Sequence, residues 1–560
     1  MGIVFLLTAF RIWLAVKTPL YIQADAAYDD MLFVRYAMEL LKGNWLGDYC
    51  SLTLAKTVSY PLILAFNYTF GIPYSLGMIC AYVVSCILFV HAINQFIHNN
   101  YFAIAGYLFL LFSPVMFHEE NIQKVYRGGY IVIFSMLVLS AIIGMFAEAK
   151  NVQGKKIYGW SALGIFSLPI FWYLKEDSIW LLPFILVGMC ITMVVIIRLH
   201  CEKKAKLKRI VAVVLPIIVL GCISGLYKQV NNHYYGIAAV TDRSGTNFEK
   251  VISDLIQIED PSTDTVWITR NMLEQAEENS PTLMSIKPQI DERMQLWVGD
   301  GEIDGDIFIW VFREAVDSAG IYDRGSEGVE QFYGDIHQEL QEAYAQGRLQ
   351  SNANDRIYVS SVSRGYTIQE FAEYFSGRIK EVARTFVCYE QNVTSINAAR
   401  GSYDDIAIMA RLTNSEFIWQ NTSNDLDVYA AKIVALDQHI VKLYQVTGKP
   451  FFYLGMLGIF VLFAKICVKC KQKKFEASDL ELLTVVVGLA LTILVLTVAV
   501  MWFCNFLSIR KVYDYMCGAV PIMNIIEVIG IYQIVLLLVE WTKKFRERSN
   551  NKVSNKQLED

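Results

Sequence analysis

Three carboxylates within six positions are the first feature of this chain that could do chemistry. Asp25, Asp29 and Asp30 stand between the first long apolar stretch and a segment with helical periodicity. Carboxylates that lie close together at a membrane surface are partly removed from water, and both effects raise the pKa of a carboxyl group. Such a group could take the proton from an acceptor hydroxyl or amide. Asp29, Asp25 and Asp30 are therefore rival candidates for this base.

Basic side chains in the same loop and in later loops could hold a phosphate group. A phosphate that leaves with its lipid needs positive charge close by, and arginine also presents a planar fork of donors. The expected phosphate contacts are Lys56, Arg127, Lys175, Arg510 and Lys511. For Arg510 and Lys511, anchoring of a span at the membrane surface is an equally good interpretation.

A second set of polar residues stands farther along the chain. Glu119 and Glu120 could orient an acceptor or hold a metal, or they could belong to an ordinary solvated loop. Asp177 would be a polar partner of Lys175 at a membrane boundary, where an unpaired charge is costly. His233 follows the seventh apolar stretch, in a place suited to an acceptor, although a structural role is the better interpretation.

The acidic group opens a short amphipathic helix that we expect over residues 30–42. Its apolar residues fall on one stripe, as in a helix that lies in the membrane interface. These residues are Leu32, Phe33, Tyr36, Ala37, Leu40 and Leu41. Asp29 and Asp30 could therefore do no more than cap this helix at its positive end. The apolar segment 60–71 is too short to cross a membrane.

The composition indicates an integral membrane protein. Hydrophobic residues make up 54% of the 560 residues and charged residues 18%, whereas soluble domains average about 45–50% and about 25%. Ten stretches approach the length of about 20 apolar residues that a span needs. They are 2–20, 73–97, 101–117, 129–148, 157–174, 178–199, 210–228, 450–468, 482–504 and 515–540. The net charge of -5 gives no reason to expect a nucleic-acid partner.

Basic residues in the short loops set the expected orientation. If the N-terminus is cytoplasmic, each strong basic cluster beside a span falls on the cytoplasmic side. These clusters lie at 150–156, 198–209, 465–474 and 543–548. Ten spans then return the C-terminus to the cytoplasm. We therefore expect a multi-pass protein of the cell membrane with both termini inside.

The chain is expected to divide into four parts. A seven-span membrane module covers 1–228, a polar extracytoplasmic domain covers 229–449, three more spans cover 450–542, and a basic cytoplasmic tail covers 543–560. Helical spacing in the polar domain predicts helices over 306–320, 327–346, 367–390 and 425–445. The expected fold class is an α-helical polytopic membrane protein with a mainly α extracytoplasmic domain inserted after the seventh helix.

The order of features in the first outer loop resembles that of the GT-C glycosyltransferases. The features are Tyr28-Asp29-Asp30, Arg35-Tyr36-Ala37, Gly43-Asn44-Trp45-Leu46, Lys56, Tyr60-Pro61-Leu62 and Phe70-Gly71. The resemblance is nearest to the branch that holds the protein O-mannosyltransferases and the lipid A aminoarabinose transferases. It covers roughly residues 20–72, is loose over the next six spans, and does not extend to 229–449.

The resemblance implies a role for two residues. The first acid of the family's pair, the presumed catalytic base, falls on Asp29, and the family's lysine that contacts the donor phosphate falls on Lys56. The chain departs from the family in having Asp-Asp where Asp-Glu is usual. It also has Lys56-Thr57-Val58 where the family has Lys-Pro-Pro, which weakens the assignment of Lys56 more than that of Asp29.

The resemblance implies a membrane glycosyltransferase that uses a polyprenyl-phosphate-linked sugar, with a glycan, lipid or protein as acceptor and membrane lipid around it. It leaves open whether a divalent metal takes part, and we assign no cofactor and no metal ligand. One alternative is a non-transferase membrane protein of polysaccharide export, such as a flippase, polymerase or transporter. Another is a membrane-anchored protein whose extracytoplasmic domain binds a ligand.

Overall fold

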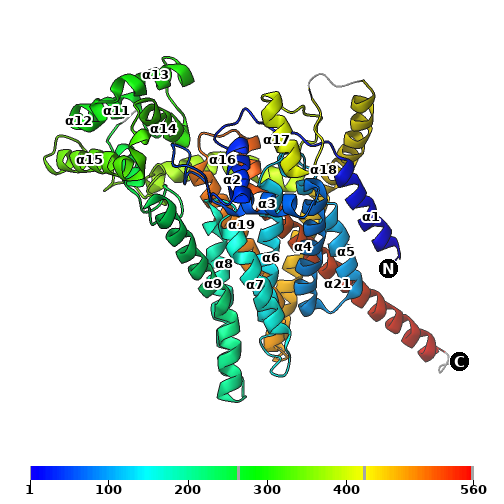
Figure 1. The fold of residues 1–560 in the computed structure, drawn as a ribbon. Coiled ribbons are helices and arrows are strands. Elements are labelled where there is room, and N and C mark those ends of the chain that lie inside the picture. Colours follow the sequence, from blue (N-terminus) through cyan, green and yellow to red (C-terminus); the bar gives the residue numbers. More distant parts are fainter. Residues whose placement is uncertain (1, 261–264, 420–423, 557–560) are drawn as a thin grey trace.

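The computed structural model describes residues 2–260, 265–419 and 424–556, and every named element in these ranges is a helix (Figure 1). Seven helical segments are long and apolar enough to cross a membrane. They are α4 (Tyr74–Ile97), α6 (Gly128–Ala147), η3 (Ser178–Leu181) with α8 (Leu182–Arg198), α9 (Lys203–Tyr235), most of α18 (Asn424–Lys471), α19 (Ala477–Phe503), and α20 (Ile509–Met516) with α21 (Val520–Lys556). This agrees with the expected class, a helical membrane protein.

Three further stretches that we expected to span form shorter helices. These are α1 (Gly2–Lys17), α5 (Asn100–Leu111) and α7 (Lys156–Trp172). At about 1.5 Å per residue, a helix of 17 residues is a few ångströms shorter than a hydrocarbon core of about 30 Å. The total of ten spans therefore stays a prediction, whereas seven segments meet the requirement by length and composition.

Helix α6 occupies the centre of the bundle. It packs against α4, α7 and α8, and nearly all of its residues are buried. A helix that is covered on every side needs no polar stripe, which explains why α6 is apolar around its whole circumference. On the other side of the bundle α18 crosses α21 at Gly455, Gly458 and Gly530, where a side chain would collide with the opposite backbone. Small residues let membrane helices approach this closely.

The polar insert is helical, as expected. One apolar core joins α10 (Asn247–Ile256), α11 (Arg270–Asn279), α12 (Pro281–Met284), α13 (Lys287–Val298), α14 (Phe308–Ser318) and α15 (Gly325–Ala345). By contrast α16 (Ile368–Cys388) and α17 (Tyr403–Thr413) pack on the core of the membrane bundle. The helices expected over 306–320, 327–346 and 367–390 correspond to α14, α15 and α16, and 425–445 is the first part of α18.

Both expected ends of the insert fall inside continuous helices. Position 229 lies within α9, and position 449 lies within α18. A change from apolar to polar residues marks the depth at which a helix leaves hydrocarbon, but it carries no signal that ends the helix. Figure 1 shows the consequence, because α9 runs as one rod from the far end of the bundle to the base of the insert.

Candidate functional site

The loop that carries the three carboxylates is held between two distant segments. The backbone N–H of Tyr21 donates to the carbonyl of Gln123 at 2.9 Å, and the N–H of Ala24 donates to the carbonyl of Arg400 at 2.8 Å. Such strand-like pairing satisfies the backbone groups of an extended segment. The first loop is therefore fixed by the segment before α6 and by the end of the insert, just ahead of α2 (Asp30–Lys42).

Helix α2 has the bounds that its amphipathic pattern predicts, but Asp29 does not cap it. No side-chain cap hydrogen bond forms at Asp29. Its carboxylate instead lies 2.7 Å from the Lys56 amine, and Tyr126 donates its hydroxyl to the same carboxylate at 3.4 Å. The Asp29 side chain is 49% exposed and that of Lys56 10% exposed. Asp29 is therefore paired with the lysine named from the sequence and is open to a substrate.

The electrostatics of the acidic pair correct one expectation. Burial alone would raise the pKa of Asp29, but the positive charges of Lys56, Arg127 and Lys124 outweigh it and hold the pKa well below its ordinary value. The prediction of a raised pKa at Asp29 was thus wrong. Lys56 comes from the first loop, whereas Lys124 and Arg127 come from the loop before α6, and the approach of these two loops has no local signal in the sequence.

Asp30 shows the opposite behaviour. Its side chain is fully buried, with the Lys124 amine 3.3 Å away, and no described residue donates a hydrogen bond to its carboxylate. Burial raises the pKa of Asp30 to about 7. Because it is enclosed, Asp30 cannot touch an acceptor directly. It was expected among the catalytic residues, but in this position it can act only as a charge next to Asp29.

Asp30→Asn should flatten the pH dependence of stability. The folded protein keeps the Asp30 proton to about pH 7, whereas an unfolded aspartate loses it near 3.8. Between these values the folded state binds more protons, so this group makes the wild type less stable as pH rises, by at most about 4 kcal/mol. Asparagine cannot ionise, so the thermal midpoint of the variant should increase relative to that of the wild type as pH rises. A constant offset between the two midpoints across this range would contradict the raised pKa.

Arg127 is buried and forms an ion pair with Glu176, whose side chain is 27% exposed. Its guanidinium lies 2.9 Å from Glu176 and donates to the carbonyl of Leu174 at 3.1 Å. Burial alone would raise the pKa of Glu176, but the charges of Arg127, Lys56 and Arg243 lower it to about 2. The charge of Arg127 also acts on Asp29, and its role as a phosphate contact stays a prediction. The sequence did not identify Glu176 as its partner.

The loop that contains Glu176 also places Lys175. The Lys175 amine lies 2.6 Å from Asp177 and 3.6 Å from the ring centre of Tyr515 in α20. This confirms the predicted partnership of Lys175 and Asp177. A cation over an aromatic face and beside a carboxylate is held in a defined position at the boundary of the bundle.

The second acidic motif binds the other two predicted cations. Arg510 pairs with Glu119, and Lys511 lies 2.9 Å from Glu120. Lys124 also lies 3.5 Å from Glu120, which links this pair to Asp30. The ion pairs of Arg510 with Glu119 and of Lys511 with Glu120 therefore join α20 to the loop before α6. Neither glutamate is left in an isolated solvated loop.

Two predicted residues lie apart from this cluster. Asp25 is exposed and pairs with Arg400 of the insert at 2.9 Å. His233 is exposed in α9, and its ring contacts Tyr234 edge to face at 5.3 Å between centroids. Among the described residues, no contact joins either of them to Asp29 or Lys56. The rival base and the predicted acceptor histidine are thus not brought into the site.

An apolar groove opens among the membrane-spanning helices below the Lys175–Asp177 loop. It has a volume of about 500 Å³ and lies between α6, α8 and α19. Its lining includes Trp180, Phe184, Val187, Leu483, Val487 and Leu491. Trp180 belongs to η3, which begins directly after Asp177. The groove therefore starts a few residues along the chain from the charged cluster, a connection that no sequence pattern indicated.

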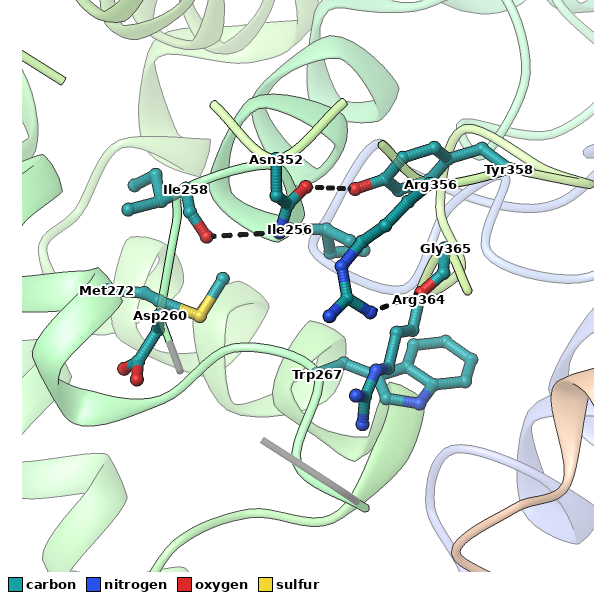
Figure 2. Close-up of a pocket in the computed structure, with 10 residues that line it drawn as sticks. All are labelled: Ile256, Ile258, Asp260, Trp267, Met272, Asn352, Arg356, Tyr358, Arg364 and Gly365. Atoms are coloured by element: carbon teal, nitrogen blue, oxygen red, sulfur yellow. Dashed lines mark hydrogen bonds between the residues drawn. The ribbon is translucent and has the colours of Figure 1, made fainter. Parts of the chain in front are cut away.

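A second pocket lies within the insert but is only water-sized. Its volume is about 10 Å³, and Figure 2 shows Arg356 donating to the carbonyl of Gly365 inside it, at 2.9 Å. Arg356 also pairs with Glu370 at 2.8 Å. The pocket is too small for a sugar and belongs to the packing of the insert.

No ready-made metal site exists in the ranges that the structure describes, because no three His, Cys, Asp or Glu side chains gather there. Comparisons with protein-family models, with curated proteins and with solved structures find no match for this chain. Its function therefore has to be inferred from the chemistry of the charged cluster and the groove below it.

Proposed function

We propose that this protein is a membrane glycosyltransferase that moves a sugar from a polyprenyl-phosphate donor to a glycan, lipid or protein acceptor. The observation that carries the proposal is the contact of Asp29 with Lys56 at 2.7 Å, with the acid half exposed and the lysine nearly buried. A reactive carboxylate beside a fixed cation is the arrangement that transfer from a lipid phosphate requires.

The reaction balances with the groups at this site. The acceptor oxygen forms a bond to the anomeric carbon, and the bond from that carbon to the phosphate oxygen breaks. The polyprenyl phosphate leaves with the electron pair, and the acceptor proton passes to Asp29. Lys56 and Arg127 stabilise the negative charge that develops on the leaving phosphate, because both are fixed before the reaction starts.

Binding of the donor would make Asp29 a stronger base. In the free protein the cations around Asp29 are paired with carboxylates, namely Lys56 with Asp29 and Arg127 with Glu176. A phosphate that approaches these cations competes with Asp29 for them. As the positive field on Asp29 is partly neutralised, the pKa of Asp29 rises towards its ordinary value. The base thus becomes effective only when a donor is present.

The apolar groove would hold part of the lipid chain. Its lining is almost entirely aliphatic or aromatic, and it lies within helices that are apolar enough to be surrounded by lipid. Because its outer end is formed by Trp180, a chain in the groove would leave its phosphate close to Lys175 and the Arg127–Glu176 pair.

We place the charged cluster and the insert on the extracytoplasmic face of the cell membrane, with both termini in the cytoplasm.

Val187→Trp should impair long-chain donors selectively. Val187 lines the groove, and an indole at this position fills space that the lipid chain would occupy. The KM for a full-length polyprenyl-phosphate sugar should rise by about 10-fold or more, which corresponds to about 1.4 kcal/mol of lost binding. A donor with only two isoprene units should be affected little. Release of radiolabelled sugar from a panel of lipid-phosphate sugars measures both constants.

Val194→Trp is the matched control, because Val194 lies two turns farther along α8, is also exposed, and does not line the groove. Equal effects of Val187→Trp on the short and the long donor would show that the groove does not bind the lipid.

A further inference from the structure

Three aromatic rings form a continuous row beside the charged cluster. Tyr28 lies between Trp310 and Trp297, with ring centroids 5.0 Å and 5.9 Å apart. Trp310 belongs to α14 and Trp297 to α13, whereas Tyr28 comes from the first loop. We call these three residues the aromatic row. It is built jointly by the insert and the membrane module.

The two ends of the row lie in different surroundings. The Lys56 amine is 5.2 Å from the ring centre of Trp310, and Tyr28 directly precedes Asp29 in the chain. Trp310 is 9% exposed, whereas Trp297 at the other end is 37% exposed. The row therefore leads from solvent to the Asp29–Lys56 pair.

Two polar groups stand beside the row, a carboxylate at Trp297 and a paired guanidinium at Trp310. Glu314 accepts a hydrogen bond from the indole N–H of Trp297 at 2.9 Å, which fixes the ring plane. Arg243 lies 5.5 Å from the Trp310 centroid and is paired with Asp306 at 3.3 Å. Because Arg243 already has a carboxylate partner and the Glu314 carboxylate stands at the exposed end, the row favours an uncharged ligand over an anion.

The shape of such a site suits a saccharide. A pyranose ring has an apolar face of C–H groups and a rim of hydroxyl groups, so one face can lie on an aromatic ring while the rim meets carboxylates and a guanidinium. Aromatic surfaces with a few placed polar groups are typical of small-ligand sites. A lipid chain fits less well, because α13 stands at the outer end of the insert, away from the membrane-spanning helices (Figure 1).

We propose that the aromatic row binds the acceptor, that this acceptor is an uncharged saccharide chain, and that the row guides one of its hydroxyl groups to Asp29. The inference rests on the proposed transferase function and narrows the acceptor from glycan, lipid or protein to glycan. It also gives the insert a role, which is to supply two of the three rings of the acceptor site.

Direct binding tests the row separately from catalysis. Full-length protein in detergent is titrated with cellohexaose, chitohexaose and maltohexaose, and with an uncharged decapeptide, while intrinsic tryptophan fluorescence is recorded. We expect at least one hexasaccharide to bind, and Trp297→Ala to weaken that binding by about 10-fold or more. Leu296→Ala removes the neighbouring exposed side chain of α13 and should bind as the wild type does. Trp297→Phe keeps a ring and should fall between the two.

A second readout separates failure of the row from failure of the proposed function. Hydrolysis of a lipid-phosphate sugar to water needs the donor site but no acceptor, so Trp297→Ala should retain it while the KM for the saccharide acceptor rises. Normal hydrolysis with no saccharide binding, or with binding that Trp297→Ala leaves unchanged, overturns the row but not the transferase. Binding of the decapeptide alone also overturns it. Absence of both transfer and hydrolysis in the wild type overturns the proposed function itself.

Discussion

Asp29→Asn should lower the kcat of sugar transfer by about 10²- to 10⁴-fold, the range that a general base contributes. Asparagine keeps the size of the side chain and an oxygen that can accept from Lys56 and Tyr126, so the folded structure should be retained. What it loses is the ability to take the acceptor proton. The measurement is release of sugar from a polyprenyl-phosphate donor by purified protein, with the amount of folded protein determined by size-exclusion chromatography.

The rival assignment supplies the comparison. Asp25 stands four residues earlier, and its carboxylate is occupied by Arg400 at 2.9 Å. Asp25→Asn should therefore leave kcat close to that of the wild type. If Asp25→Asn loses turnover and Asp29→Asn keeps it, the base is Asp25 and the contact of Asp29 with Lys56 is structural.

The pH profile gives an independent check on Asp29. The pH at which kcat/KM falls on acidification reports the pKa of the base in the free enzyme. The corresponding acid limb of kcat reports its pKa in the donor complex. Because Lys56, Arg127 and Lys124 lower the pKa of Asp29 in the free protein, the acid limb of kcat/KM should lie below that of an ordinary aspartate. A bound phosphate competes for these cations, so the acid limb of kcat should lie at higher pH. Limbs at the same pH would mean that the donor does not approach these cations.

The sequence predicted local features of the site well. The amphipathic pattern defined α2 with its observed bounds, because the apolar residues of a short helix repeat every three to four positions. The resemblance named Asp29 and Lys56 separately, one as a base and the other as a phosphate contact, and it did not predict their direct contact. Lys175 and Asp177 are neighbours in sequence, and their ion pair needs only a tight turn.

Features that depend on distant parts of the chain could not be predicted in this way. Arg510 and Glu119 are 391 residues apart, so their ion pair has no local signal. The pKa of Asp29 falls because Lys56 of the first loop and two cations of the loop before α6 converge on it. The aromatic row joins the first loop to α13 and α14, and only the packing of the insert onto that loop reveals it.

Arg127→Met should destabilise the folded protein by about 1–3 kcal/mol, less than the loss from a fully buried ion pair, because the Glu176 side chain is 27% exposed. The guanidinium of Arg127 lies 2.9 Å from Glu176, and its charge is the main reason that the pKa of Glu176 falls to about 2. Without Arg127, the partly exposed Glu176 carboxylate lacks its principal cation. The thermal or denaturant midpoint of the purified protein in detergent measures the loss.

The double variant Arg127→Met with Glu176→Gln decides whether charge or packing causes this loss. If an uncompensated carboxylate is the cause, removing it should restore most of the stability. If the double variant is as unstable as the single one, the loss comes from the contact of Arg127 with the Phe33 ring, whose centroid is 5.2 Å away. Arg384→Met serves as the matched control, because the Arg384–Glu390 pair is exposed and its removal should leave the midpoint unchanged.

The pH dependence of the Arg127→Met defect has a definite sign. In the wild type the lowered pKa of Glu176 adds stability above the ordinary pKa of a glutamate, and this stability is lost as pH falls towards about 2. In Arg127→Met the Glu176 carboxyl group loses the cation that lowers its pKa most, so it takes up a proton at a higher pH than in the wild type. The difference between the two proteins should therefore be largest near neutral pH and should shrink as the solution is acidified. A difference that is independent of pH would exclude the buried charge as the cause, whatever its size.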